Sequence, residues 1–568
     1  MQIRFVLVLI SLTSILSAQQ QQRPARRMNP GTQQAVAQQP EQQVPSGGIE
    51  GQVVNAATGE PVKKVSLLLM PVMTRQTPDG SYSANTDANG QFSMKDVKPG
   101  TYVLMGERTG FVRGSYGARS QMQQGTPLTI ASGQVVKSIS FRLQPHAVIS
   151  GRILDEDGEP LAHVQVQATS NRYIQGRRQL VPNGTSSTND LGEYRIFGLA
   201  PGRYYVSAIH RSRLSYGPTS RAVSGNPDVP EEDYAPTYYP GMTDSSGAVP
   251  IAIAAGQPVG NIDMKLVKTH TVRVRGHVTG GAGRGRTMVM LNPRDSMGMF
   301  DRNLSAPQGP DGKFEIRGVT PGSYWLTAQS SDDGVRYVAR VPVNVGNSSV
   351  EGVEVTLKPG MEISGVLSGE GQTKVDFTQV NISLQPKEFA PMMGGSSVRV
   401  KDDGTFVIRN VFPDTYRVAA FAGGQSFYVK SVLAGQQEAP KGEITIVDGA
   451  PPSLTVVVSS AAAQVSGSVF NDKKEPALGS TAVLIPSADR RDQQQYYKTA
   501  TVDQNGTFNF SGIAPGDYTL LAWQNVDAGA WQDPEFFARF ETKGKTLHVK
   551  ENDVLTAELE ALNADTGQ

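Results

Sequence analysis

Short segments of the chain alternate apolar with polar residues, and each segment is followed by a turn signal. In the C-terminal copy, Phe508 and Phe510 alternate with polar neighbours, and Pro515 and Gly516 then precede Tyr518. An alternation with a period of two predicts a half-buried β-strand, and a Pro-Gly pair is typical of a tight turn. The pattern therefore predicts a strand, a turn with its glycine at positive φ, and a second strand that begins near the tyrosine.

This pattern occurs five times with one constant spacing. A glycine is followed after two residues by an aromatic residue and after nine residues by a proline, and a tyrosine stands three residues beyond the proline. In the fourth copy Asp414 replaces the glycine of the turn, for which we expect a local cost of about 1 kcal/mol. We expect each tyrosine ring to pack in a core and each hydroxyl to bond a nearby backbone group, as in the tyrosine corner of β-sandwiches. The five tyrosines are Tyr102, Tyr204, Tyr324, Tyr416 and Tyr518.

A second glycine opens each copy and divides the chain into domains. These glycines are Gly51, Gly151, Gly276, Gly365 and Gly467, so the period is about 100 residues, which suits one β-sandwich. We predict an all-β chain of five tandem Ig-like or transthyretin-like antiparallel β-sandwiches. Because the links between them are short, we expect restricted bending and a monomeric rod of roughly 150 Å. The predicted sandwiches span residues 48–145, 147–268, 271–358, 361–459 and 464–560.

The N-terminal residues predict export. Arg4 precedes an apolar segment at residues 5–16, and the small residues Ser17 and Ala18 then provide a cleavage site, so residues 1–18 are predicted to be a signal peptide. Residues 19–47 are rich in Gln and Pro and are predicted to form a disordered linker. The chain has no cysteine, so we expect neither a disulfide nor a lipid-modified cysteine. We expect a bacterial protein located in the periplasm, on the outer surface or outside the cell.

Charge and composition exclude some partners. The 53 basic and 52 acidic residues nearly cancel, so no strong field favours nucleic acid. The 60 glycines and 36 prolines follow no collagen-like period and instead favour many turns between short strands. No segment after the predicted signal is long and apolar enough to cross a membrane.

The motifs together resemble a known domain family. Gly-x-Val/Ile, Asp-x-x-Gly-x-Pro-Leu, Asp-x-x-Gly-x-Phe and Pro-Gly-x-Tyr are similar to the carboxypeptidase regulatory-like domain, over residues 48–560 and most clearly in copies one, two and five. The resemblance implies a transthyretin-like sandwich of the carbohydrate-binding-like fold. It also implies an accessory role, because in that family the module usually accompanies a catalytic domain or an outer-membrane receptor. In the third copy a glycine-rich run at residues 280–285 replaces the Gly-x-Pro-Leu turn.

Residue patterns of catalytic or metal sites are scarce. His548 and Glu551 form a His-x-x-Glu sequence, but no histidine follows it, so we assign no zinc site. The turn carboxylates could chelate calcium, but turn formation is the favoured interpretation for aspartates at such positions. We therefore assign no catalytic residue, no metal and no cofactor. The turn carboxylates are Asp87, Asp190, Asp311, Asp403 and Asp503.

Two aromatic-rich insertions are the candidates for ligand contact. Aromatic rings on loops can stack on sugar rings or anchor a protein partner. The alternative is that these rings pack onto their own sandwich or onto its neighbour. The candidates are Tyr234, Tyr238 and Tyr239 in the second copy, and Trp523, Trp531 and Phe536, with Phe537 and Phe540 beside them, in the fifth copy.

These observations predict a secreted, non-catalytic binding protein whose sandwich loops contact a polysaccharide or the cell surface. The first alternative is a structural or adhesive spacer that contacts other envelope proteins. The second is an accessory module for a separately encoded peptidase or outer-membrane transporter. A hydrolase has the least support.

Overall fold

The structure is a computed structural model that describes most of the chain beyond its N-terminal region. The predicted signal peptide and residues 19–44 of the predicted linker lie outside the described residues. The last linker residues belong to the first sandwich, because the Gly133 N–H donates to Pro45 O at 3.0 Å and the first strand begins at Gly47. The described residues are 45–72, 80–118, 123, 125–174, 177–210, 231–281, 286–294, 304–387 and 396–564.

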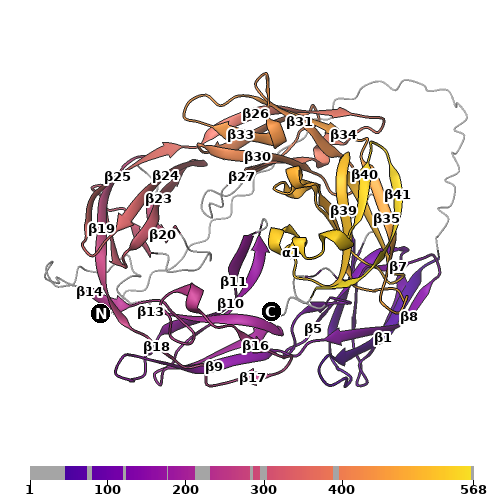
Figure 1. The fold of residues 1–568 in the computed structure, drawn as a ribbon, viewed down its shortest axis with the longest axis horizontal. Coiled ribbons are helices and arrows are strands. Elements are labelled where there is room, and N and C mark those ends of the chain that lie inside the picture. The colour runs from indigo at the N-terminus through magenta and orange to yellow at the C-terminus, as the bar shows by residue number, and fades with distance from the viewer. Residues whose placement is uncertain are drawn as a thin grey trace, which may run out of the picture. The chain divides into compact units, whose positions relative to one another are not determined.

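The fold is all-β, as predicted, and consists of five tandem β-sandwiches, each with a hydrophobic core of its own (Figure 1). In the first sandwich one sheet has the order β4-β1-β8, and β2 and β5 are central in the other sheet. The strands are β1 (Gly47–Asn55), β2 (Ser66–Pro71), β3 (Tyr82–Asn85), β4 (Gln91–Val97), β5 (Gly100–Glu107), β6 (Gly114–Ser115), β7 (Leu128–Ile130) and β8 (Val135–Leu143).

The second sandwich repeats this arrangement, with β9 central in one sheet and β10 and β13 central in the other. Its hairpin β10–β11 is long, and its strand β14 pairs with the next sandwich. The strands are β9 (Ala147–Leu154), β10 (Val164–Ile174), β11 (Arg177–Ser187), β12 (Glu193–Leu199), β13 (Gly202–His210), β14 (Glu231–Tyr234), β15 (Thr237–Tyr238), β16 (Ile251–Ile253), β17 (Pro258–Val259) and β18 (Met264–Lys265), and the 3-10 turn η2 spans Ser245–Gly247.

In the third sandwich the two layers are joined edge to edge, because β24 also pairs with β25. The fourth sandwich has the sheet orders β29-β26-β34-β31-β32 and β28-β27-β30-β33. The strands of the third are β19 (Lys268–Gly280), β20 (Met288–Pro293), β21 (Leu304–Pro307), β22 (Lys313–Val319), β23 (Gly322–Asp332), β24 (Val335–Val345) and β25 (Val350–Pro359). Those of the fourth are β26 (Met361–Glu370), β27 (Asn381–Pro386), β28 (Ser396–Arg399), β29 (Thr405–Val411), β30 (Asp414–Phe421), β31 (Tyr428–Ala434), β32 (Gln437–Glu438), β33 (Glu443–Ile446) and β34 (Leu454–Ser459), with the 3-10 turns η3 (Phe377–Gln379) and η4 (Pro440–Gly442).

The fifth sandwich adds short helices to the same plan. Its sheets have the orders β38-β35-β41 and β37-β36-β39-β40. Its elements are β35 (Ala463–Phe470), β36 (Thr481–Pro486), η5 (Ala488–Arg490), η6 (Gln494–Tyr496), β37 (Lys498–Thr501), β38 (Thr507–Ile513), β39 (Gly516–Asn525), η7 (Ala530–Gln532), α1 (Pro534–Ala538), η8 (Glu541–Lys543), β40 (Lys545–Val549), β41 (Val554–Glu560) and β42 (Leu562–Asn563). No helix in the described part of the chain is long and apolar enough to span a membrane.

The first strand of every sandwich lies between an antiparallel neighbour and a parallel last strand. The parallel pairs are β1–β8, β9 with β17 and β18, β19–β25, β26–β34 and β35–β41. The sequence predicted only antiparallel pairs, so these parallel pairs are a correction. The other pairs among the described strands are antiparallel, except β39–β42, which is also parallel. The residue pattern could not reveal the difference, because inward and outward side chains alternate in the same way in both kinds of strand.

The opening glycine is required by this parallel pair. At Gly365 a β-carbon would lie 2.6 Å from Leu454 O of the last strand, and it would lie closer still to the corresponding oxygen at the other four opening glycines. On its other side the glycine faces the motif aromatic across the antiparallel pair. The five cross-strand pairs are Gly51–Phe92, Gly151–Tyr194, Gly276–Phe314, Gly365–Phe406 and Gly467–Phe508. The aromatic ring therefore occupies the space that the glycine leaves without a side chain.

The motif tyrosines form the predicted corner in all five sandwiches. Each ring is at most 5% exposed. Each hydroxyl donates to the carbonyl oxygen four residues earlier, at 2.7–2.9 Å. The bond joins the two strands that the Pro-Gly turn connects, so the tyrosine fixes the turn from inside the core.

The glycine after proline has the predicted positive φ in three copies, at Gly202, Gly322 and Gly516, where φ lies between 148° and 159°. A second residue, which the sequence did not indicate, has a left-handed conformation three residues before the proline, where the pairing with the first strand shifts register in a β-bulge. Asp414 is absent from the residues with positive φ, so the expected cost at this position does not arise. The left-handed residues are Asp96, Gly198, Gly318, Asn410 and Gly512, with φ between 56° and 79°.

Neighbouring sandwiches touch at their junctions. The His146 N–H donates to Gly110 O at 3.0 Å between the first and second sandwiches, and the Arg336 N–H donates to Asn410 Oδ1 at 2.8 Å between the third and fourth. The fifth sandwich also contacts the first, because Gln504 Nε2 donates to Thr129 O at 2.8 Å. In a single-file rod the first and fifth sandwiches would not touch. The predicted rod is therefore not supported by the bond between Gln504 and Thr129.

The opening glycine can be tested at Gly365. Gly365→Ala would push a methyl group against Leu454 O and the Phe406 ring, so we expect the fourth sandwich to lose about 1–3 kcal/mol. Calorimetry of the full chain should show one lowered transition. The control is Gly423→Ala in the same sandwich, where no atom lies within 4 Å of the added carbon. Equal midpoints for the two variants would contradict the close-approach explanation.

The tyrosine corner can be tested at Tyr518. Burial raises the pKa of Tyr518 to about 12, so between pH 10 and pH 12 the unfolded chain ionises first and the fifth sandwich loses stability. We expect Tyr518→Phe to cost about 1 kcal/mol at pH 8, because it removes the bond to Ala514 O. This deficit should shrink at pH 11 in calorimetric scans. The control is Tyr496→Phe, a half-buried position in the same sandwich. If Tyr518→Phe lost no stability at pH 8, or lost the same amount at pH 8 and pH 11, the tyrosine corner would not be the stabilising contact that we assign.

Candidate functional site

Tyr234 lies at the boundary between the second and third sandwiches. It ends β14, which pairs antiparallel with β19, so Tyr234 stands opposite Lys268. Its ring makes an edge contact with His210 at 5.1 Å between ring centres, and Lys268 Nζ lies 5.7 Å from the centre of the Tyr234 ring. His210 Nδ1 in turn lies 3.1 Å from Asp233 Oδ1. The ring thus joins two sandwiches, as the packing alternative expected.

Tyr238 and Tyr239 are half-buried on the second sandwich. Tyr238 in β15 pairs with Ser207 of β13, and the Tyr239 N–H donates to Val206 O at 2.9 Å. The Tyr239 side chain packs against the core of this sandwich. Both residues, like Tyr234, are partly exposed.

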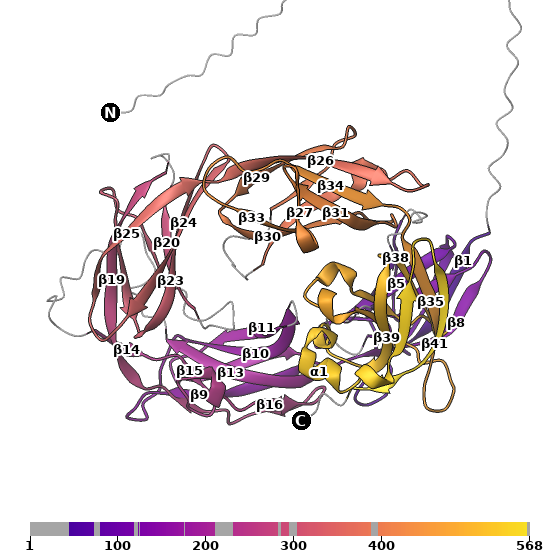
Figure 2. The same cartoon turned by 45° about the horizontal axis from the view of Figure 1, so that its top comes forward.

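The three candidates of the fifth sandwich lie together in a buried cluster. Trp523 is 0% exposed, Trp531 8% and Phe536 6%. The segment that carries η7, α1 and η8 covers the outer face of β36 and β39, and Figure 2 shows α1 beside β39. The ring centres of Phe536 and Phe540 lie 5.9 Å and 5.7 Å from that of Trp523. These side chains form a second core on the sandwich, so their rings do not present a stacking surface.

The long hairpin of the second sandwich reaches this cluster. Tyr173 of β10 packs against it, and the Arg178 side chain donates to the Tyr173 hydroxyl at 3.0 Å. Both indole N–H groups, of Trp523 and Trp531, are buried without a hydrogen-bond partner among the described residues. Such donors carry a desolvation cost, which apolar packing around the rings offsets.

The turn carboxylates are used by the turns themselves. Asp87 Oδ1 accepts from the backbone N–H groups of Asn89 and Gln91 at 2.9 Å and 2.8 Å, and Asp503 accepts in the same way. Asp311 and Asp403 each accept one backbone N–H from the residue two positions later. These bonds support the turn-forming interpretation. In the second sandwich the accepting residue is Asn189, not Asp190.

His548 lies in a pair that is not a metal site. Its Nδ1 lies 2.6 Å from Asp517 Oδ1, on neighbouring strands β40 and β39, and both side chains are exposed. Within the described ranges no three His, Asp or Glu side chains are grouped so that they could hold a metal ion. Glu551 accepts a hydrogen bond from the Tyr428 hydroxyl at 2.7 Å.

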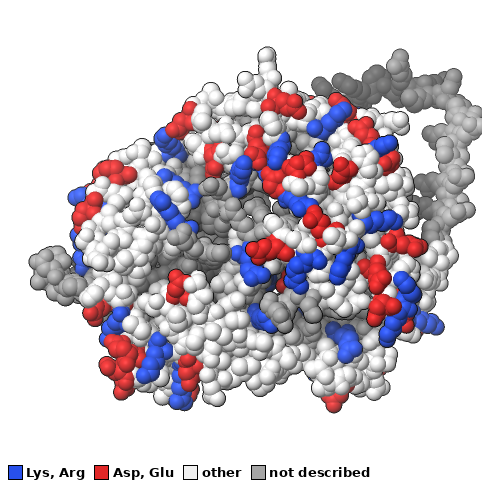
Figure 3. Space-filling view, viewed as in Figure 1, with Lys and Arg blue, Asp and Glu red and all other residues white. Residues whose placement is uncertain are grey.

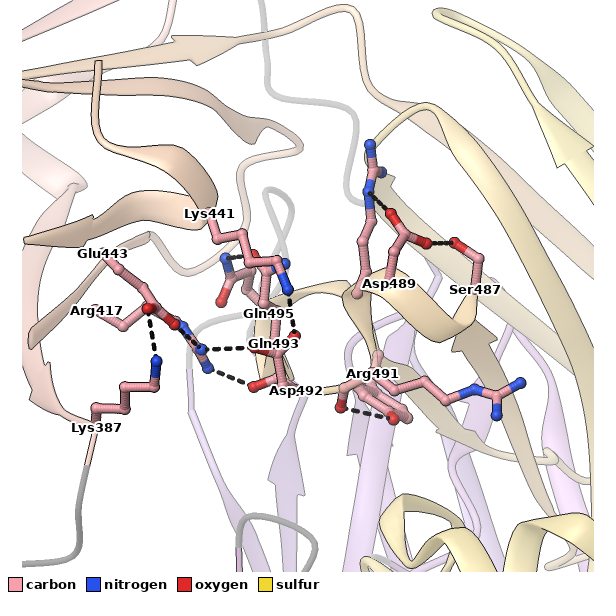
Figure 4. A network of polar contacts seen from close by, with 12 residues as sticks. Lys387, Arg417, Lys441, Glu443, Ser487, Asp489, Arg491, Asp492, Gln493 and Gln495 are labelled. Carbon is pink, nitrogen blue, oxygen red and sulfur yellow. Dashed lines mark hydrogen bonds and ion pairs between the residues drawn. The ribbon is translucent and has the colours of Figure 1, made fainter. Parts of the chain in front are cut away.

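A charged network that the sequence did not indicate joins the fourth and fifth sandwiches (Figure 4). Arg417 Nη2 lies 2.7 Å from Glu443 Oε1 in its own sandwich and 3.2 Å from Asp492 Oδ2 in the fifth. Lys441 Nζ also lies 3.5 Å from Asp492 Oδ1. The hydrogen bond from Lys387 and the pairing with Arg417 hold the pKa of Glu443 below its ordinary value, against the effect of burial. No local pattern marks these residues, because Arg417 and Asp492 are 75 positions apart.

A cationic stack on the third sandwich was also missed. The Cζ atoms of Arg294 and Arg340 lie 4.4 Å and 4.0 Å from the centre of the Trp325 ring. Trp325 follows the motif tyrosine directly, so strand alternation turns it to the outer face. In the sequence, the position of Trp325 directly after the inward-facing tyrosine indicated that this aromatic residue points outward.

Comparisons with known sequences and solved structures give only distant similarities. A search of curated protein sequences finds no match. A streptococcal ancillary pilin is 14% identical, over 55% of this chain and 99% of the pilin, with a TM-score of 0.20. The minor pilin GBS52 of Streptococcus agalactiae is 13% identical, over 39% and 97%, with a TM-score of 0.23. The major pilin subunit BcpA of Bacillus cereus is 10% identical, over 55% and 99%, with a TM-score of 0.15. At these TM-scores the similarity to the pilins carries no argument about either fold or function.

The family match concerns the first two sandwiches. The model of the carboxypeptidase regulatory-like domain matches residues 48–144 and 148–232. These ranges hold the opening glycines Gly51 and Gly151 and the motif tyrosines Tyr102 and Tyr204. The first two sandwiches are therefore carboxypeptidase regulatory-like domains, the family that the motifs of these copies indicated.

Proposed function

We propose that the protein is an exported, non-catalytic chain of five β-sandwiches that binds or spaces partners at the cell envelope. One observation carries the proposal: the side chains most suited to chemistry or ligand contact are already engaged in the fold. The motif tyrosines bond the backbone, the turn carboxylates cap turns, and the aromatic insertion of the fifth sandwich is packed. Surfaces, rather than a reactive cleft, are then what the chain offers to a partner.

Junction contacts support a structural or adhesive role. β14 extends the sheet of the third sandwich, and the Arg417–Asp492 pair ties the fourth sandwich to the fifth. The Ser426 hydroxyl accepts the Gly512 N–H at 2.9 Å, and the Tyr428 hydroxyl donates to Glu551 Oε1 at 2.7 Å across the same junction. Such contacts limit bending between neighbours, which suits a protein that holds surfaces at fixed positions.

Charge favours neutral or weakly charged partners over nucleic acid. On the face shown in Figure 3, Lys and Arg alternate with Asp and Glu without a large area of one sign. The net charge of +1 agrees with this mixture. A nucleic-acid partner requires a basic footprint, so it is not part of the proposal.

More specifically, we propose that the loops of the sandwiches bind a carbohydrate or another component of the cell surface. Tyr238 and Tyr239 are the candidates that support it, because both rings remain half-exposed. Trp523, Trp531 and Phe536 do not support it, since their rings are enclosed. A role beside a separately encoded peptidase or outer-membrane transporter remains an alternative that comes from the family resemblance alone.

Photo-crosslinking on intact exporting cells tests the proposal. One variant carries Tyr238→p-benzoylphenylalanine, and the control carries the same change at Phe197, a strand position that is 66% exposed. We expect covalent adducts with envelope material from position 238 and few from position 197. Adducts at position 197 alone would contradict the proposal that the sandwich loops bind the partner. Turnover of a peptide or glycoside substrate by the purified chain would contradict the non-catalytic role.

A further inference from the structure

The last strand of the fifth sandwich, β41, has an open edge. Among the described strands it ends the sheet β38-β35-β41 and lies beside β35 (Figure 1). Ala557 O faces β35, because a β-carbon at Gly467 would clash with it. The N–H and C=O groups of the residues on either side, Thr556 and Glu558, therefore point away from β35. No other segment of the described chain forms a backbone hydrogen bond with these groups.

The fourth sandwich closes the same edge with a strand of its own. There β31 pairs antiparallel with β34, and Leu433 stands opposite Thr455, the residue that corresponds to Glu558. In the fifth sandwich the segment between β39 and β40 instead forms η7, α1 and η8, and it packs on the outer face of β36 and β39. No described strand therefore takes the place beside β41 that β31 takes beside β34.

Core-facing side chains of β41 are partly exposed at this edge. Leu559 lies two residues after the position opposite the opening glycine, and it is half-buried, as is Leu555. In the other four sandwiches the side chain at the position of Leu559 is at most 2% exposed. A strand added beside β41 would cover both leucines and remove their apolar surface from water. The four buried counterparts of Leu559 are Phe141, Met264, Val355 and Val456.

The solvent-facing side of β41 is acidic. Glu558 and Glu560 are exposed, and the strand contains no lysine or arginine. Ser468 of β35 stands opposite Glu558, and Glu560 Oε2 lies 3.7 Å from the Nζ of Lys474. Pairing of two copies at this edge would bring the glutamates of both strands onto one face, where like charges repel. The charge therefore disfavours a second copy of β41 and favours a basic partner strand.

We propose that the open edge of β41 binds an extended protein segment in which apolar residues alternate with lysine or arginine. The added strand pairs with the outward N–H and C=O groups of Thr556 and Glu558, as β31 pairs with β34. Its apolar side chains cover Leu555 and Leu559, and its basic side chains lie beside Glu558 on the solvent face, because both sets follow a period of two. The partner at this edge is thus a polypeptide.

This inference deepens the proposed function, on whose binding role it rests, by naming a kind of partner and a place on the chain. It concerns the role in which the chain contacts other envelope proteins, and it does not involve the loop of Tyr238. Loop adducts at position 238 would be unaffected by changes at Glu558, and an edge that bound nothing would leave those adducts in place. The two proposals can therefore fail separately.

Peptide binding to the full chain tests the inference. The probe is a fluorescent Lys-Val-Lys-Val-Lys-Val-Lys peptide with blocked ends. One control peptide replaces every Lys by Glu and so reverses the charge, and the other replaces every Val by Gly and so keeps the charge without the apolar side chains. We expect the probe to bind in anisotropy titrations and both controls to bind at least about tenfold more weakly. Hydrogen exchange should show slower exchange of the amides of residues 556 and 558 when the probe is bound.

Two changes at Glu558 separate strand pairing from charge attraction. Glu558→Pro removes the N–H that the added strand would bond and leaves the groups that face β35 in place, so binding of the probe should fall about tenfold. Glu558→Gln keeps the N–H and removes the charge, so it should weaken binding at low salt and have little effect at high salt. Glu438→Gln is the matched control, because it removes an exposed glutamate from the fourth sandwich, and it should leave binding unchanged.

Calorimetry of Glu558→Pro checks that the fifth sandwich stays folded, and Glu558→Gln tests the same position without a change of backbone. Four results would each overturn the inference. They are no binding of the probe, equal binding of either control peptide, slowed exchange only outside β41, and a loss in Glu438→Gln as large as that in Glu558→Gln.

Discussion

The close approach of the last strand to the opening glycine is the constraint on which each sandwich depends. The carbonyl oxygen of the last strand occupies the position that a side chain would need, and the motif aromatic covers the glycine from the opposite strand. An aromatic side chain buries a large apolar area, so this arrangement places strong packing where the backbone needs close contact. The tyrosine corner then fixes the next turn from inside the same core. Glycine, aromatic and tyrosine are thus three parts of one packing unit, which explains why they recur together at constant spacing.

Once every sandwich has a core of its own, the outer surfaces are free to differ. A chain without cysteine has no disulfides to stabilise its domains, so the cores carry that requirement. The second sandwich uses its surface for β14, the third carries Arg294 and Arg340 stacked on Trp325, and the fifth adds the aromatic cap over β36 and β39. The Arg417–Asp492 pair belongs to the same class of additions. Function in such a chain is expected in these additions rather than in the repeated unit.

The sequence predicted the repeated unit well because its signals are local. Strand alternation, the turn residues and the tyrosine are all close together in the sequence, and the motif predicted that the tyrosine hydroxyl bonds a nearby backbone group. The structure identifies that group as the carbonyl four residues earlier. The bulge at Asp96 or Gly512 was missed because a one-residue register shift leaves little trace in a hydrophobic pattern. The parallel last strand was missed for a similar reason. The sequence left two interpretations of Trp531 open, ligand contact or packing, because its loop has no alternation; the folded segment shows that the side chain is buried. Arg417 with Asp492, and Trp325 with Arg294, required tertiary contacts that no spacing encodes.

Hydrogen exchange of the intact chain, read by mass spectrometry, tests the central claim most directly. If a parallel last strand closes each sandwich over its opening glycine, the amides of β1, β9, β19, β26 and β35 lie in the middle of a sheet. These five segments should then be among the slowest to exchange in their own sandwiches, because exchange there requires opening of the core. Opening strands that exchange as fast as the connecting turns, in any of the five sandwiches, would contradict the account.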